Sequence, residues 1–128
     1  MKFHKNEIFP MNLLFITEEK EYLAVMRDSG ITEPFPNMGE AATLAADTPD
    51  QGLIILVLLG EHASLPKETV AAILAHESVH VKQFLFDAIG EDTPGVETEA
   101  YLVEFYTRYL LTELKKREDK KTKKTTKK

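Results

Sequence analysis

The chain contains no cysteine among its 128 residues. Disulfide bonds, thiol catalysis and cysteine-based structural zinc sites are therefore excluded, and any bound metal must be held by histidine or carboxylate side chains. Long apolar runs are missing as well. The longest, Leu53 to Leu59, is far below the ~20 residues of a membrane-spanning helix. We therefore expect no membrane partner.

The start of the chain also lacks the pattern of an export signal. Pro10 and Asn12 interrupt its apolar run, and Glu18 and Glu19 follow without a small-residue cleavage site. We expect a soluble, cytoplasmic protein. We expect His4 to lie on its surface.

Charge is distributed unevenly along the chain. Residues 115–128 hold nine of the 16 Lys and Arg residues but two of the 21 Asp and Glu residues, so residues 1–114 carry a net charge of −12. No apolar side chain follows Leu114. We expect one domain over 1–114 and a basic tail over 115–128, a frayed helix end passing into disorder. The tail either binds nucleic acid or another anionic surface, weakly and in a salt-sensitive way, or, as we favour, solubilises the chain or folds back on the acidic domain.

Apolar patterning predicts an α+β domain. A short strand over 13–16 precedes a helix that begins near Thr17 and ends near Ser29. Three prolines favour a loop over 31–52, with room for a short strand or a turn of helix over 40–46. The run between Gly52 and Gly60 predicts a buried strand.

The most informative motif is His76-Glu77-Ser78-Val79-His80. On an α-helix, residues four apart share a face, so both imidazoles can reach one zinc ion. Glu77 then lies beside the metal, where it can take a proton from the metal-bound water. A helix over roughly 65–89 is indicated by the Ser64 and Pro66 start signals and by Gly90 as a stop. Ser78 departs from the pattern, since an apolar residue is usual there.

A catalytic zinc needs a third protein ligand. The candidates are Glu97 and Glu99, which open a second long helix after Thr93 and Pro94. The two carboxylates are turned by ~160° from each other on that helix, so only one of them can be the ligand. Glu97 shares its face with Tyr101.

An HExxH motif followed by a helical Glu-x-Glu-Ala segment resembles the gluzincin metallopeptidases. The resemblance implies a minimal gluzincin-like fold, a small β-sheet packed on two long helices. It also implies a zinc ion (Zn²⁺) held by His76, His80 and Glu97, with Tyr101 where the family has an Asp. The chain further resembles small HExxH proteins carried by bacteriophages and prophages, which would place it in the host cytosol.

The expected function is that of a zinc metallopeptidase. Glu77 would be the general base and then the general acid in hydrolysis of an amide bond of a protein or peptide, which pairs with a sheet edge. A hydrolase acting on cell-wall peptide is one alternative. The other is a non-enzymatic binding protein for a host or phage partner, with a structural or absent metal. The sequence does not indicate an oligomeric state.

Three further side chains are candidates for stabilising an oxyanion. His62 follows the buried strand, and the alternative for it is an exposed turn histidine. Tyr101 and Tyr106 are the others, and each can equally be a core or surface aromatic residue.

Overall fold

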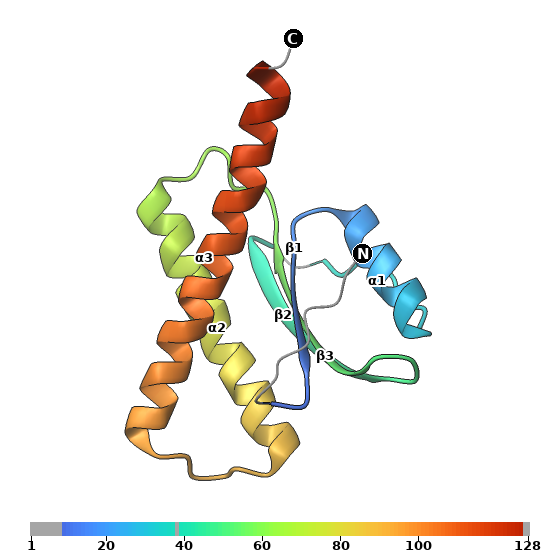
Figure 1. The fold of residues 1–128 in the computed structure, drawn as a ribbon, viewed down its shortest axis with the longest axis vertical. Helices are drawn as coiled ribbons and strands as arrows, with labels where there is room; N and C mark the ends of the chain where they lie inside the picture. Colours follow the sequence, from blue (N-terminus) through green and yellow to red (C-terminus); the bar gives the residue numbers. More distant parts are fainter. Residues whose placement is uncertain (1–8, 38, 127–128) are drawn as a thin grey trace.

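The computed structural model describes residues 9–37 and 39–126, with side chains to residue 121. His4 lies outside the described residues. The described chain is an α+β domain with a small mixed sheet and helices on both of its faces (Figure 1). This class, with its small sheet and two long helices, is the one that the sequence predicts. The elements follow in the order β1 (Asn12–Ile16), α1 (Glu19–Ser29), β2 (Ala41–Thr48), β3 (Gly52–Leu59), α2 (Lys67–Ile89) and α3 (Val96–Thr126).

Strand β3 is the centre of the sheet. The strand order is β1-β3-β2, in which β1 runs parallel to β3 and β2 runs antiparallel to it. Residues Ile54 to Leu59 are each 0–2% exposed. The continuous apolar run is therefore explained by burial on both faces, as the sequence predicts.

The two faces of β3 support two separate cores. Ile55, Val57 and Leu59 lie in the core that α2 and α3 cover, whereas alternate residues such as Leu56 lie in the core that α1 covers. This division follows from the two-residue period of a strand. Figure 1 shows α1 on one side of the sheet and the α2–α3 pair on the other.

Strand β2 is longer than its composition indicates. The sequence predicts a loop with room for a short strand or a turn of helix, but an eight-residue strand forms, and Thr43 lies opposite Val57 in the ladder. Alanine-rich segments have low intrinsic strand propensity, so pairing with β3 determines this structure. Among the described strands, none pairs with the outer edge of β2.

Helix α2 begins and ends close to the predicted residues. It starts at Lys67, with Pro66 in the N-cap position and no side-chain cap from Ser64. Gly90 ends it with a φ of 77°, and its N–H donates to the Asp87 carbonyl. A positive φ is adopted by glycine without steric cost, which explains the stop.

Helix α3 extends through most of the expected tail. It continues to Thr126, and its last turns project beyond α2 (Figure 1). Arg117 donates to the Phe15 carbonyl at 2.7 Å and to the Glu21 carboxylate at 2.7 Å. The helix therefore continues past the expected boundary after Leu114, and Arg117 beyond it is bonded to residues of β1 and α1.

No helix in the described part of the chain is both long enough and apolar enough to cross a membrane.

Candidate metal centre on helix α2

The two histidines of the motif lie side by side on α2. His76 Nε2 and His80 Nε2 are 3.2 Å apart, and the two ring planes are inclined by 75°. His76 is exposed and His80 is half-buried. The one-turn spacing of the helix therefore brings the two ring nitrogens to one point at the surface.

Gln83 determines the tautomer of His80. His80 Nδ1 lies 2.8 Å from the Gln83 side-chain oxygen. An amide oxygen only accepts hydrogen bonds, so Nδ1 carries the proton and donates it. In the neutral ring, Nε2 is then left with the lone pair that a metal ligand needs.

The spacing of the pair suits two positions of one zinc ion. Zinc–nitrogen bonds of about 2.0–2.1 Å at a tetrahedral angle separate the two nitrogens by about 3.3 Å. The observed separation of 3.2 Å is close to that value. The two imidazoles thus fit as two of the ligands of a zinc site.

The expected third ligand is not brought to the pair. Within the described residues, no group of three or more His, Cys, Asp or Glu side chains is placed to hold a metal. Glu97 is exposed on the first turn of α3, and Glu99 forms an ion pair with Lys82. The set of His76, His80 and Glu97 is therefore not assembled in this structure.

The packing of α3 explains why Glu97 does not lie at the histidine pair. Ser78 Oγ lies 2.8 Å from Thr107 Oγ1, and Lys82 pairs with Glu99, so α3 contacts the Ser78–Lys82 side of α2. At ~100° per residue, Ser78 is turned by ~160° from each of the two histidines. Helix α3 thus packs on the side of α2 that points away from the imidazoles, whereas the resemblance requires it to approach them.

The same contact accounts for the unusual polar residue after the motif glutamate. Ser78 is fully buried, and its hydroxyl donates to the Ala75 carbonyl at 2.7 Å. Its Oγ also lies within hydrogen-bond distance of Thr107, which bonds to the Val103 carbonyl. The buried serine is satisfied because the Ala75 carbonyl accepts its proton, and the side of α3 that faces it presents the polar Thr107 hydroxyl.

Glu77 is buried between α2 and the edge strand. It is 6% exposed, and its Oε1 accepts a hydrogen bond of 2.8 Å from Thr43 Oγ1 on β2. Among the described residues, no Lys or Arg side chain forms an ion pair with Glu77. The sequence did not indicate Thr43, because the segment that contains it reads as a loop.

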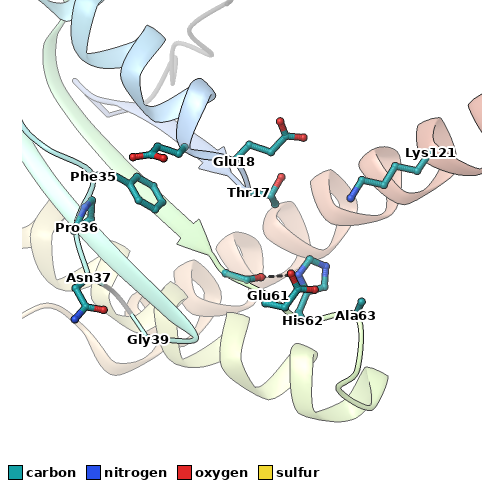
Figure 2. Close-up of a pocket in the computed structure, with 12 residues that line it drawn as sticks. Thr17, Glu18, Phe35, Pro36, Asn37, Gly39, Glu61, His62, Ala63 and Lys121 are labelled. Carbon is teal, nitrogen blue, oxygen red and sulfur yellow. Dashed lines mark hydrogen bonds between the residues drawn. The ribbon is translucent and has the colours of Figure 1, made fainter.

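His62 belongs to a different part of the surface. A cavity of about 500 Å³ lies at the carboxyl ends of the parallel strands β1 and β3, and His62 lines it with Glu18, Glu61 and Lys121 (Figure 2). His62 Nδ1 lies 2.8 Å from the Gly60 carbonyl, to which it donates. None of the residues that line this cavity belongs to the HExxH motif. The cavity therefore gives no support for an oxyanion role of His62 at the histidine pair.

The two candidate tyrosines also lie away from the histidine pair. Tyr106 is 1% exposed in the core that α2 and α3 cover, and burial raises its pKa to about 12. Tyr101 is 65% exposed on α3. Tyr106 is therefore a core residue, and Tyr101 is a surface residue on the helix that packs away from the histidines.

Comparisons of the chain with known protein families, with curated proteins and with solved structures find no match.

Proposed function

We propose that the protein is a zinc-dependent hydrolase of amide bonds in peptides, with His76 and His80 as metal ligands and Glu77 as the general base. The observation that carries the proposal is the 3.2 Å separation of the two Nε2 atoms, beside a glutamate held by the edge strand. The three motif residues have the same roles in this function as in HExxH metallopeptidases. The proposal departs from gluzincins in leaving Glu97 out of the ligand set, so the third protein ligand that a catalytic zinc needs must come from another side chain when the metal binds.

The chain's own groups supply binding and proton transfer. An extended peptide can pair with the outer edge of β2, which no other described strand covers. Such pairing uses the peptide backbone, so it carries little sequence preference of its own. Thr43 and Glu77 would then lie beside the bound backbone, since Thr43 is part of β2.

Glu77 accepts a proton from the attacking water and returns it to the leaving amine. Thr43 is bonded to Oε1, and among the described residues no group is bonded to Oε2. Oε2 is thus the atom that takes the proton. A bound zinc ion would polarise the scissile carbonyl and lower the pKa of its water towards ~7.

A Glu77→Gln variant tests the proposal. The amide cannot accept the water's proton, so the variant should keep its fold and its zinc while hydrolysis falls by orders of magnitude. The assay should use zinc-loaded protein with a library of unstructured peptides and a cell-wall peptide fragment. Activity that survives Glu77→Gln, or a wild-type protein that cuts nothing, would overturn the proposal.

A non-enzymatic binding protein is the second candidate. It is favoured by two exposed aromatic residues one turn apart on α3, Tyr101 at 65% and Phe105 at 52% exposed, and by the incomplete ligand set. In that case the histidine pair binds metal without turnover. The peptide assay separates the two candidates, because a binding protein retains substrate peptide intact at any zinc concentration.

A further inference from the structure

The contact between Thr43 and Glu77 joins the sheet to the helix that carries the motif. Thr43 Oγ1 lies 2.8 Å from Glu77 Oε1 and 3.3 Å from the Glu77 backbone oxygen. The two residues are 34 positions apart in the sequence. The position of the Glu77 carboxylate is therefore determined from two elements, α2 through its backbone and β2 through a hydroxyl.

The hydrogen bond between Thr43 and Glu77 has one possible donor. A carboxylate and a carbonyl only accept, so the single hydroxyl proton of Thr43 is donated to Glu77, and the shorter distance favours the carboxylate. Hydrogen bonds to a charged acceptor are about twice as strong as neutral ones. The side chain of Thr43 is also β-branched, which restricts χ1 and keeps the hydroxyl in place.

We propose that Thr43 is a positioning residue, whose hydroxyl holds Oε1 of Glu77 so that Oε2 is presented to the attacking water. The proposal rests on the function proposed above, and it adds a residue on the edge strand to the catalytic apparatus. Thr43 itself exchanges no proton with the substrate. It acts through Glu77, and its pairing with Val57 of β3 holds its backbone in the sheet.

Thr43→Val and Thr43→Ser separate the hydroxyl from the volume of the side chain. Valine keeps the shape and favours strands but cannot donate. We expect Thr43→Val to lower kcat by about 10–100-fold, the usual effect of losing a supporting hydrogen bond. KM should stay within about twofold, since peptide binding through the β2 backbone is unchanged. Thr43→Ser should retain most of the wild-type kcat, and Thr43→Ala should behave as Thr43→Val does.

Two results would overturn the proposal while leaving the hydrolase intact. One is a wild-type kcat in both Thr43→Val and Thr43→Ala. The other is a serine variant that loses as much kcat as the valine variant, which would assign the effect to packing. Circular dichroism and zinc content of each variant show that the fold and the metal are retained.

A measurement without substrate keeps the two proposals distinguishable. In protein labelled with ¹³C at glutamate carboxyl groups, the Glu77 resonance is assigned by its loss in Glu77→Gln. It should move in Thr43→Val and stay in place in Thr43→Ser. If the wild-type protein is inactive, both the hydrolase function and the catalytic role of Thr43 are wrong. If the resonance does not move in Thr43→Val, Thr43 does not donate a hydrogen bond to Glu77.

Discussion

Lys82 of α2 forms an ion pair with Glu99 of α3, and this contact shows which side of α2 the second helix covers. The Lys82 side chain is 11% exposed, so the ammonium group is largely enclosed by the two helices. On α3, Glu97 is turned by ~160° from Glu99. The carboxylate that the resemblance implies as a ligand thus points away from α2, and its rival is already paired.

Metal content tests this arrangement. His76→Ala and His80→Ala should each remove bound zinc, because a single imidazole binds it weakly. Glu97→Ala should leave the zinc content unchanged, since Glu97 is exposed on the side of α3 turned from α2. The number of zinc ions per chain after dialysis, measured by inductively coupled plasma mass spectrometry, checks these expectations.

Glu99→Ala is the matched control for that comparison. It should lower the thermal midpoint by a few degrees through loss of the Lys82 partner but keep zinc. Release of zinc by Glu97→Ala would contradict the observed packing of α3. It would show that the helix turns towards the histidines when metal is bound.

A second prediction concerns the hydrogen bond between His80 and Gln83. Gln83→Leu removes the acceptor that keeps the proton on Nδ1, so the variant should bind zinc about 10–100-fold more weakly. Gln83→Glu keeps an acceptor in place and should retain the affinity or raise it. Titration calorimetry with zinc chloride measures both. Equal affinities in the leucine and glutamate variants would mean that Gln83 does not select the tautomer.

The motif and its helix could be predicted from local sequence, whereas the completion of the site could not. The spacing of His76 and His80 and the stop at Gly90 are properties of one helix, and the structure has them where the sequence places them. Which side of that helix α3 covers depends on the contacts of Ser78 and Lys82. The apolar pattern of neither helix indicates which side of α2 is covered by α3.

Contacts between residues distant in sequence also explain where the structure differs from the predicted fold. Strand β2 forms because β3 offers it a ladder, although its alanines are poor strand formers. Helix α3 is anchored past Leu114 because Arg117 meets the Phe15 carbonyl, 102 residues earlier in the chain. Both features are set by partners distant in sequence, so periodicity and composition could not indicate them.

The third prediction concerns stability at low pH. Burial raises the pKa of Glu21, but the hydrogen bond and positive charge of Arg117, together with backbone hydrogen bonds from Thr17 and Glu18, outweigh this effect, so the pKa lies below its ordinary value of 4.5. The native state therefore binds the Glu21 proton less readily than the unfolded state does. Stability from the pair is present above about pH 4.5 and is lost as the pH falls through the lower folded value.

Glu21→Gln isolates this contribution, since glutamine keeps the shape and does not titrate. At pH 7 the wild-type protein should be more stable to urea by ~1–2 kcal/mol. The difference should hold down to about pH 4.5 and then narrow as the acid form of Glu21 is populated. A difference that stays constant to pH 3 would show that the pair does not stabilise the native state through charge.

The last prediction concerns the C-terminal turns of α3. Arg117 donates to the Phe15 carbonyl, to Thr17 and to Glu21, and its guanidinium lies 5.4 Å from the centre of the Phe15 ring. Residues 120–128 are Lys and Thr alone, so they have no apolar side chain to bury and adjacent lysines repel. Truncation after Lys121 should therefore leave the thermal midpoint unchanged.

Truncation after Lys116 should instead lower the midpoint by several degrees, because it removes Arg117 and leaves the Glu21 carboxylate without its partner. Arg117→Lys is the matched point variant. A lysine keeps the charge but cannot donate to a carbonyl and a carboxylate in a fixed fork, so it should recover part of the loss. Differential scanning calorimetry of the three proteins orders these effects. If the two truncations unfold at the same temperature, the contacts of Arg117 do not hold α3 to the sheet.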